Sequence, residues 1–521
     1  MNLWLSLNKA LTLFPNKEAI VDGEKRFTYR DLGKRVANVV ANMQALGLRK
    51  GDVVAIAAPN CHQYLEIYYA CGIAGIVLSP LNYRLAVREM SQILIEADCK
   101  LLFVHPDFAG HVPDLKSCVP TLDHVIRVGG SDDTYEALCH GTADPAKLDS
   151  LPQLVGDDLA QIYFTSGTTG RPKGVMLTQG NVTFNALAVI ADLRLDESDS
   201  WLHGAPMFHL ADAWATFAIT WVGGKHVFIP YFNAATALRC IEEHGITTSV
   251  LVPTMLNAML NDAALPQHDY SSLRMILTGG SPIAPDMVRE AIEKFRCEYI
   301  QLYGMTETSP FLTLSRPKAH QLTGDCAREV NIRCRTGRPY IGAEVKVVKP
   351  DGNEVAHDNL EVGEIIARGP TVFAGYWKQP EATAQAIRKG WIHTGDLAVV
   401  CPEGFINIVD RAKDMIITGG ENVFSTEVEY VLQEHPAILE CAVFGIPHEF
   451  WGESVKAAVV LRESQSATEH QLIEYVRERL AHYKVPRGID FHPALPKTGS
   501  GKIYKKALRE AYWREKEKQV N

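Results

Sequence analysis

The first 130 residues alternate short apolar runs with patterns of helical period. Positions 53–57 and 101–104 are unbroken apolar runs of strand length, whereas 29–46 and 89–97 repeat apolar side chains at helical spacing. Strands that are buried on both faces of a parallel sheet are apolar throughout. The alternation therefore predicts an α/β architecture with largely parallel sheets.

The same pattern resumes after a polar stretch. Residues 129–158 carry several acids and two prolines and are expected to form a surface connection. Apolar runs of strand length then recur, for example at 248–252 and 275–277. From residue 343 the runs become short strands separated by turns, which is typical of a small β-rich subdomain.

The length of the chain, 521 residues, exceeds what one hydrophobic core normally supports. Beyond residue 410 strands and helices mix for just over a hundred residues. We predict an α/β fold with a large N-terminal domain, residues 1–410, made of two α/β subdomains and a small β-rich subdomain. A small α+β C-terminal domain, residues 411–521, is expected to follow it.

Composition narrows the class of protein. The chain is 46% apolar and 22% charged, as in globular proteins, and its formal net charge of -9 argues against a partner such as nucleic acid, which needs a basic face. The eleven cysteines are scattered and form no CxxC pair, so we predict neither a disulfide framework nor a zinc site. A reducing, cytoplasmic location fits this pattern best.

The sequence also predicts no integral membrane segment. Residues 1–9 begin with an apolar run that Ser6 and Asn8 interrupt, which favours an amphipathic helix over a signal peptide. Apolar stretches such as 213–222 reach about half of the roughly 20 residues that a membrane helix needs. We expect a soluble protein that ends in a solvated amphipathic helix from Ile503.

The segment TSGTTGRPKG, residues 165–174, has the composition of a phosphate-binding loop. Its glycines let backbone N–H groups approach a phosphate, its hydroxyls add donors, and Lys173 adds a positive charge. Two alternatives stay open: a mobile hairpin that binds nothing, and the loop of a P-loop ATPase. The order GxxxxGK[ST] is absent, which counts against the ATPase.

The longer run YFTSGTTGRPKGVMLT, residues 163–178, resembles the AMP-binding signature of the adenylate-forming enzymes, which include acyl-CoA synthetases. Further motifs that resemble this family follow in its order: QLYGMTET (301–308), Tyr376 with GWIHTGDL (390–397), DRAKD (410–414), GGENV (419–423) and PKTGSGKI (496–503). The resemblance implies that ATP and a carboxylic acid form an acyl-adenylate, which then reacts with CoA.

The resemblance also implies an ATP site. Tyr303 would stack on adenine, Asp396 and Arg411 would bind the ribose, and Glu307 with Thr165 would hold Mg²⁺ against the phosphates. Without the motifs, Tyr303 would be read as a core tyrosine, Asp396 as a turn aspartate and Arg411 as a surface arginine. The implied ATP-binding residues are Thr165, Ser166, Gly167, Thr168, Thr169, Gly170, Lys173, Gly280, Gln301, Tyr303, Gly304, Thr306, Asp396, Arg411 and Lys502.

Catalysis is expected to depend on a residue near the end of the chain. The resemblance implies that Lys502 bridges the carboxylate and the α-phosphate, where negative charge develops during adenylation. The other expected catalytic residues are His209, Thr306 and Glu307.

The resemblance implies a mobile C-terminal domain. It turns about Lys413, so that one orientation presents the catalytic lysine and the other presents Gly419 and Gly420 to the pantetheine of CoA.

The acid site is expected around His209, in the motif PMFHL, together with Gly279, Gly280 and Met305. A packed core histidine is the alternative. Residues 211–222 hold three large aromatic rings and no Lys or Arg, which favours an apolar acid over a dicarboxylate.

We expect a medium- or long-chain fatty acid as substrate, and hence a role in fatty acid metabolism. An aryl or arylpropenoic acid comes second, and transfer to a separate carrier protein instead of CoA is a further alternative. The expected partners are small molecules only, and the protein is expected to be a monomer or homodimer.

Overall fold

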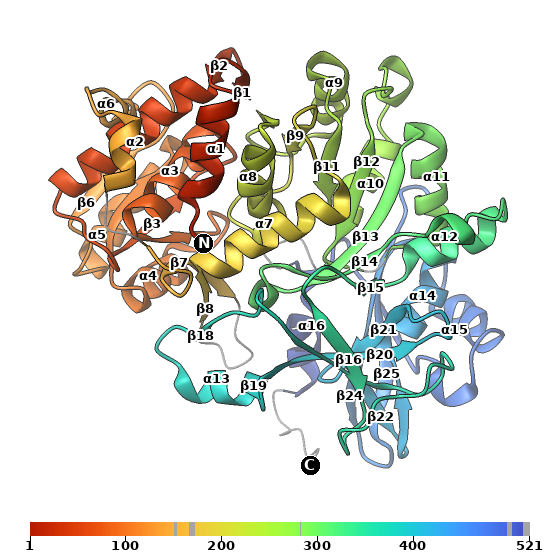
Figure 1. Ribbon diagram of the computed structural model, residues 1–521. Coiled ribbons are helices and arrows are strands. Elements are labelled where there is room, and N and C mark those ends of the chain that lie inside the picture. The colour runs from red at the N-terminus through yellow and green to blue at the C-terminus, as the bar shows by residue number, and fades with distance from the viewer. Residues whose placement is uncertain (151–153, 166–171, 282, 498–502, 514–521) are drawn as a thin grey trace. The chain divides into compact units, whose positions relative to one another are not determined.

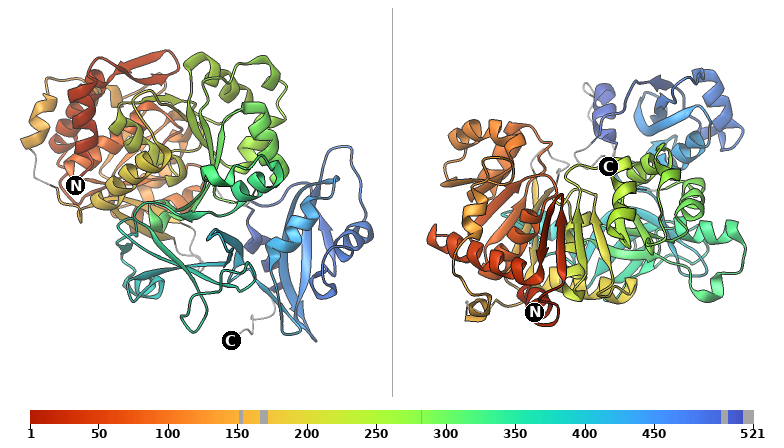
Figure 2. Two further views of the ribbon diagram at one scale, coloured as in Figure 1. Left: turned by 45° about the vertical axis from the view of Figure 1, so that its right-hand side comes forward. Right: turned by 90° about the horizontal axis from the view of Figure 1, so that it is seen from above.

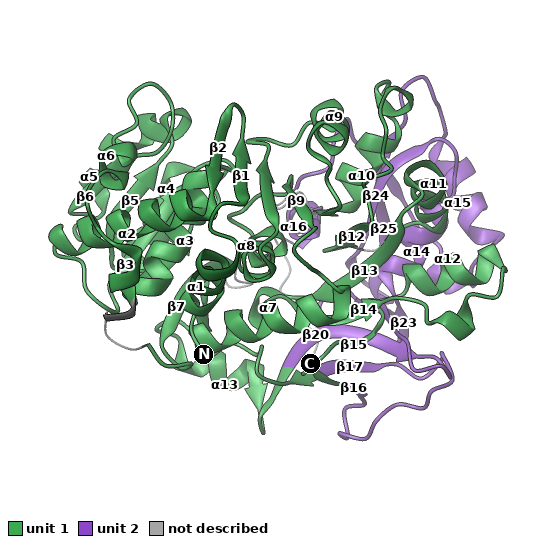
Figure 3. Ribbon diagram, turned by 45° about the horizontal axis from the view of Figure 1, so that its top comes forward, with its two compact units in different colours: residues 1–345, 367–392 green, residues 346–366, 393–521 purple. Residues whose placement is uncertain are grey.

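The computed structural model describes residues 1–150, 154–165, 172–281, 283–497 and 503–513. The chain forms two compact units, residues 1–345 with 367–392, and residues 346–366 with 393–521 (Figure 3). The domain division predicted at residue 410 stays a prediction.

The first unit contains a seven-stranded sheet of the order β18-β8-β7-β4-β3-β5-β6. Its strands are β3 (Val53–Ala57), β4 (Val77–Pro80), β5 (Cys99–Val104), β6 (His124–Arg127), β7 (Leu159–Thr165), β8 (Lys173–Thr178) and β18 (Gly375–Tyr376). The pairs from β7 to β6 are parallel, while β8 and β18 add antiparallel pairs at one edge.

A nine-stranded sheet lies in the same unit, in the order β15-β14-β13-β12-β11-β9-β10-β1-β2. Its strands are β1 (Glu18–Asp22), β2 (Lys25–Thr28), β9 (Ser200–His203), β10 (Lys225–Phe228), β11 (Thr248–Leu251), β12 (Met275–Gly279), β13 (Glu298–Gly304), β14 (Phe311–Ser315) and β15 (Arg338–Pro339). The central pairs are parallel and the edge strands β2, β14 and β15 are antiparallel.

The helices of this unit cover its sheets (Figures 1 and 2). They are α1 (Trp4–Leu13), α2 (Tyr29–Ala45), α3 (His62–Ala74), α4 (Val87–Glu96), α5 (Val112–Cys118), α6 (Tyr135–Cys139), α7 (Gln179–Leu193), α8 (Leu210–Val222), α9 (Ala234–His244), α10 (Pro253–Leu260), α11 (Pro285–Phe295), α12 (Cys326–Cys334) and α13 (Pro380–Ala386).

Strand β3 shows why its sheet is buried on both faces. Val54 and Ile56 join the core formed with α2 and α3, whereas Val53 and Ala55 join the core formed with α4 and α5. Side chains alternate between the two faces of a strand, so helices on both faces require an unbroken apolar run.

The chain passes between the two units along β16, β17 and β20, which belong to a third sheet of order β16-β17-β20-β19, with β21 also on β20. A fourth sheet lies in the second unit, with the order β23-β22-β25-β24 and β26 on β25. The remaining elements are β16 (Glu344–Val348), β17 (Gly363–Arg368), β19 (Ile387–Arg388), β20 (Trp391–Val400), β21 (Ile406–Arg411), β22 (Ile416–Thr418), β23 (Glu421–Val423), α14 (Ser425–Gln433), β24 (Ile438–His448), β25 (Gly452–Leu461), α15 (Glu469–Arg477), β26 (Ile489–Phe491) and α16 (Lys505–Trp513).

The fourth sheet is also covered on both faces. Cys441 and Val443 of β24 pack with α14 and α15, whereas Ala442 and Phe444 pack with Leu508 of α16. The structure thus confirms the predicted α/β fold class, with a large and a small unit.

Two predictions need correction in detail. Residues 129–158 are more than a surface connection, because the ring of Tyr135 is fully buried and its hydroxyl donates to Glu66 Oε2 at 3.0 Å. The C-terminal helix α16 is amphipathic as predicted, but Lys505 is ion-paired with Glu429 at 2.7 Å and is largely buried rather than solvated.

No helix in the described part of the chain is both long and apolar enough to cross a membrane.

Candidate active site

The two ends of the glycine-rich segment meet in an antiparallel hairpin. Thr165 ends β7 and lies opposite Lys173, the first residue of β8, and the Thr165 hydroxyl donates to the Lys173 carbonyl at 3.4 Å. Ser166, Gly167, Thr168, Thr169 and Gly170 lie outside the described residues. The hairpin ladder therefore fixes where the loop leaves and re-enters the sheet.

Lys173 of this hairpin lies over a tyrosine ring whose hydroxyl is bonded to a buried carboxylate. Its Nζ lies 4.8 Å from the centre of the Tyr376 ring, and the Tyr376 hydroxyl donates to Glu307 Oε1 at 2.9 Å. Burial, together with the charge of Glu307, raises the pKa of Tyr376, so the phenol stays protonated and acts as a donor. These contacts bring together the segments 165–174, 301–308 and 375–376.

Tyr376 was not among the predicted site residues, although it lies in one of the motifs. It reaches the hairpin because β18 pairs with β8, where Tyr376 lies opposite Val175. A pairing over about 200 residues has no local sequence signal, so only its place in the motif could have marked it.

Backbone contacts hold Glu307 in place. It lies in a single helical turn, η4 (Thr306–Thr308), and its carbonyl accepts from the Phe373 N–H at 2.9 Å. The next residue but one, Ser309, donates its hydroxyl to the Thr371 carbonyl at 2.7 Å. The segment around Thr306 and Glu307 is thus clamped to residues 371–373.

The oxygen atoms of Glu307 and Thr165 suit Mg²⁺, which takes one or two carboxylates and completes its shell with water and phosphate. No group of three or more His, Cys, Asp or Glu side chains is arranged to hold a metal in the part of the chain that the structure describes. A magnesium site on a nucleotide needs fewer protein ligands than that.

Three glycines that were predicted to line the ATP and acid sites, Gly279, Gly280 and Gly304, lie where a larger residue would be strained or would clash with the backbone. A Cβ on Gly279 would lie 2.9 Å from the Leu302 carbonyl oxygen, and one on Gly304 would lie 1.8 Å from that of Pro310. Gly280 has φ +85°, which favours glycine. These approaches leave no room for larger residues at the last positions of β12 and β13.

The Gln301 side chain is bonded within the protein. Its Nε2 donates to the Ser281 carbonyl at 3.2 Å, and its Oε1 accepts from the hydroxyls of Thr278 and Tyr299. Gln301 therefore fixes the loop after β12 next to Gly280, while the side chains of Tyr303 and Met305 are partly exposed.

His209 caps helix α8, and its carbonyl accepts from the N–H groups of Asp212 and Ala213 at 3.2 and 3.1 Å. Its imidazole lies against the Phe208 ring, with 4.6 Å between the centres. One turn further on, Trp214 packs against Phe311 at 5.3 Å. Helix α8 therefore presents His209 and Trp214 from consecutive turns.

The second unit contains a separate cluster of predicted residues. Asp396 on β20 lies opposite Arg411 on β21, with 3.2 Å between Arg411 Nε and Asp396 Oδ1. Asp396 is buried and Arg411 is exposed. Antiparallel pairing thus brings together the two residues that were expected to share a ribose.

The remaining predicted residues of this unit lie in turns. Lys413 follows β21, and Gly419 and Gly420 join β22 to β23 with φ +59° and +86°. A Cβ on Gly419 would lie 2.7 Å from the Trp451 ring. Lys502 lies outside the described residues.

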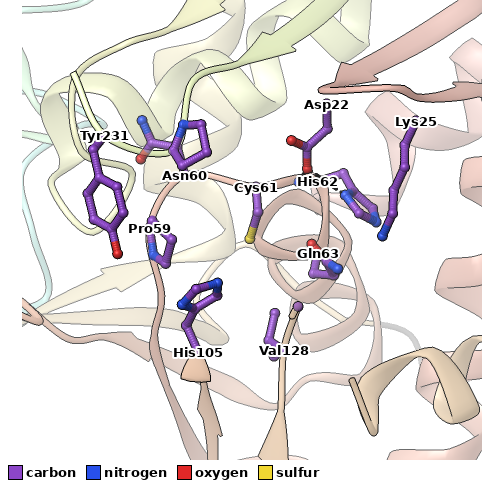
Figure 4. Close-up of a pocket in the computed structure, with 12 residues that line it drawn as sticks. Asp22, Lys25, Pro59, Asn60, Cys61, His62, Gln63, His105, Val128 and Tyr231 are labelled. Atoms are coloured by element: carbon purple, nitrogen blue, oxygen red, sulfur yellow. Dashed lines mark hydrogen bonds and ion pairs between the residues drawn. The ribbon is translucent and has the colours of Figure 1, made fainter. Parts of the chain in front are cut away.

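A cavity of about 300 Å³ in the first unit contains none of the predicted residues (Figure 4). Most of its polar lining is bonded within the protein: His62 Nδ1 lies 2.7 Å from Asp22 Oδ2, and the Tyr231 hydroxyl donates to Asp107 at 2.5 Å. Burial raises the pKa of Cys61, so its thiol stays protonated.

Comparison with known families identifies the class. The family model of the AMP-binding enzymes matches residues 7–377, and that of the AMP-binding enzyme C-terminal domain matches residues 427–502. The chain belongs to the AMP-binding enzyme family. It is a ligase of the adenylate-forming superfamily, for which ATP and CoA are the co-substrates implied.

Individual relatives are similar along nearly their whole length. The chain is 38% identical to a feruloyl-CoA synthase from Amycolatopsis sp, over 96% of each chain. It is 33% identical to the fatty acid–[acyl-carrier-protein] ligase ScoC from Streptomyces coeruleorubidus, over 97% of this chain and 96% of that protein. The crystal structure of ATP-bound MatB from Rhodopseudomonas palustris matches with a TM-score of 0.87 and 30% identity, over 98% of this chain and 99% of that one.

Proposed function

We propose that the protein is an ATP- and Mg²⁺-dependent acid–CoA ligase that activates an apolar carboxylic acid, with arylpropenoic acids favoured. The carboxylate oxygen attacks the α-phosphorus, the bond to the bridging oxygen breaks, and pyrophosphate leaves. The CoA sulfur then attacks the acyl carbon, AMP leaves, and the thiol proton passes to solvent.

The series Lys173–Tyr376–Glu307 is the observation that supports this proposal most directly. It unites the phosphate-loop end, a buried phenol and a carboxylate within one unit. Lys173 and the loop of Thr165 would hold the departing pyrophosphate. Glu307 and Thr165 would hold Mg²⁺, which neutralises phosphate charge when it is bound.

The second unit would complete the ribose site and the catalytic step. Asp396 would accept hydrogen bonds from the ribose hydroxyls, and Arg411 would lie beside the ribose. This agrees with the pairing of Asp396 and Arg411 across β20 and β21. Lys502 would stabilise the charge that develops on the α-phosphate. We further propose that the C-terminal domain, from residue 411, turns about Lys413 and brings Gly419 and Gly420 to the pantetheine.

Two features favour an arylpropenoic acid over the fatty acid expected first. The relative with 38% identity is named a feruloyl-CoA synthase. The turn of α8 after His209 also carries aromatic packing, with Trp214 against Phe311, and an aromatic wall suits a flat aromatic acid. A fatty acid is the second candidate, since ScoC is named a fatty acid ligase and its acceptor is an acyl carrier protein.

A pyrophosphate-release assay tests this proposal. The protein is incubated with ATP, Mg²⁺ and a panel of arylpropenoic, benzoic, straight-chain and dicarboxylic acids, with and without CoA. We expect acid-dependent pyrophosphate and AMP, thioester only with CoA, and the highest kcat/KM for an arylpropenoic acid. ADP and phosphate formed without acid would instead support an ATPase.

A lysine variant tests the catalytic assignment. Lys502→Ala should lose acid-dependent exchange between ATP and pyrophosphate but still convert a supplied acyl-adenylate to thioester. Exchange at the wild-type rate would remove Lys502 from the mechanism.

A further inference from the structure

A chain of four fully buried polar side chains connects helix α8 with strands β9 and β10. Asp212 Oδ2 lies 2.5 Å from His203 Nδ1, His203 Nε2 lies 3.0 Å from His226 Nδ1, and His226 Nε2 lies 3.0 Å from the Thr220 hydroxyl. All four residues have a relative exposure of 0%. We call these residues (Asp212, His203, His226 and Thr220) the α8 polar chain.

The hydrogen bonds of this chain can run in one direction. His203 donates from Nδ1 to the Asp212 carboxylate, so its Nε2 accepts from His226 Nδ1, and His226 Nε2 accepts from the Thr220 hydroxyl. Burial, together with the neighbouring His203, holds the pKa of His226 well below its ordinary value, in keeping with a neutral ring. The second Asp212 oxygen accepts from Trp201 Nε1 at 3.1 Å.

This arrangement ties both ends of α8 to the neighbouring strands. Asp212 lies in the first turn of α8 and Thr220 in the last, while His203 and His226 lie on β9 and β10. Apolar packing alone tolerates small shifts of a helix along a sheet. Buried directional hydrogen bonds specify one position, since any shift would leave buried polar groups unpaired.

The residues assigned to the acid site lie close to Asp212 at the start of α8, where His209 is the N-cap. The Asp212 N–H donates to the His209 carbonyl, so the position of Asp212 sets the cap that bears the His209 imidazole. Trp201, which donates to Asp212, also packs against Trp214 at 4.9 Å. A shift at Asp212 would therefore move both His209 and Trp214.

We propose that Asp212, His203 and His226 are positioning residues that set the acid selectivity of the ligase by fixing His209 and Trp214. This inference rests on the proposed function, because it takes His209 to be part of the acid site. No direct contact with the acid is assigned to these three residues.

The test compares Asp212→Asn and Thr220→Val with wild type, using the two acids that wild type activates best. An amide at position 212 has one acceptor oxygen in place of two, so it cannot accept from both His203 Nδ1 and Trp201 Nε1. Thr220→Val removes only the donor at the other end of the chain. The ratio of kcat/KM for the two acids is the main readout, because it does not depend on the fraction of folded enzyme.

We expect Asp212→Asn to raise KM for the acid about tenfold and to change the ratio at least fivefold, with KM for ATP within twofold of wild type. Thr220→Val should shift the ratio in the same direction by a smaller factor. The control Glu66→Gln alters another fully buried carboxylate, one that bonds Arg35 and Tyr135 instead of α8, and should leave the ratio unchanged.

A purely structural role predicts lower stability and lower kcat with the ratio and KM for the acid unchanged, and that result would overturn the proposal. If Asp212→Asn does not fold, Thr220→Val decides by the same criterion. Absence of acid-dependent pyrophosphate release in wild type would instead refute the proposed function itself.

Discussion

The hydroxyl of Tyr376 donates a hydrogen bond to the carboxylate of Glu307, although the two residues are 69 positions apart in the sequence. Glu307 has a relative exposure of 7%. The positive charge of Lys173 lies over the face of the same tyrosine ring. One phenol thus links the end of the phosphate loop to the carboxylate that we assign to Mg²⁺.

Replacement of Tyr376 by Phe should weaken the binding of Mg²⁺-ATP. A hydrogen bond to a charged group contributes about 1.5–3 kcal/mol, so we expect a loss of roughly 10- to 100-fold in kcat/KM for ATP. The ring and its contact with Lys173 would remain. Acid-dependent ATP–pyrophosphate exchange over a range of Mg²⁺ concentrations measures the effect.

Tyr135→Phe is the matched control for this variant, because it also removes a hydroxyl that donates to a buried carboxylate, that of Glu66. It should change stability without changing the Mg²⁺ requirement. Equal losses of exchange activity in the two variants would argue against a role for Tyr376 at the metal site.

The sequence predicts the strands and the motifs well, because both depend on local patterns. The apolar run 53–57 is β3, and the ends of the glycine-rich segment 165–174 lie on the paired strands β7 and β8. The contact of Tyr376 with Glu307 could not be predicted in this way, since it depends on β18 pairing with β8. Distant pairing leaves no periodicity in the sequence.

Buried polar residues were also missed for a physical reason. Asp212 lies in an apolar run and His203 follows Leu202, and a pattern of apolar positions carries no information on which polar groups meet inside the core. Their partners become visible only when α8 lies against β9 and β10.

The buried His62 predicts a pH dependence of local stability. Burial alone would lower the pKa of His62, but the hydrogen bond to Asp22 and the nearby carboxylates of Glu136, 3.7 Å away, and Glu66 outweigh it and raise the pKa. The folded protein therefore binds this proton more tightly than the unfolded chain. The resulting stabilisation is complete below the unfolded pKa of about 6.5 and is lost as the pH rises through the higher folded pKa.

Hydrogen-exchange protection of α3, which His62 begins, measures this effect. Protection should fall between mildly acidic and mildly alkaline pH in the wild type, and His62→Gln should flatten the change. His470→Gln, at a side chain that is 84% exposed, should behave like wild type. A pH profile of His62→Gln identical to that of wild type would contradict the assignment.

The ion pair between Lys505 and Glu429 should stabilise the start of α16. Lys505 Nζ lies 2.7 Å from Glu429 Oε1 and donates to the Ser425 hydroxyl at 2.7 Å. Removing one partner of a mostly buried pair leaves the other charge unpaired, so Lys505→Met should cost about 2–3 kcal/mol. The double variant Lys505→Met/Glu429→Leu should recover part of that loss.

Hydrogen exchange of α16 and half-reaction rates would test this expectation together. Helix α16 begins three residues after Lys502, so a loosened helix should slow adenylation more than thioester formation from a supplied adenylate. A double variant less stable than Lys505→Met would contradict the ion-pair argument.

Gly304→Ala should disrupt the segment that carries Glu307. A Cβ at this position would lie 1.8 Å from the Pro310 carbonyl oxygen and 2.9 Å from the Phe311 Cα, so backbone atoms would have to move. Overpacking of this kind costs about 1–3 kcal/mol or more, and the move would displace the turn that bears Glu307. We expect adenylation to fall at least 100-fold, as pyrophosphate exchange would measure.

Gly110→Ala is the control, since its Cβ would meet nothing within 4 Å, and its free energy of unfolding should stay within about 0.5 kcal/mol of wild type. Wild-type exchange in Gly304→Ala would mean that β14 can move without displacing Glu307.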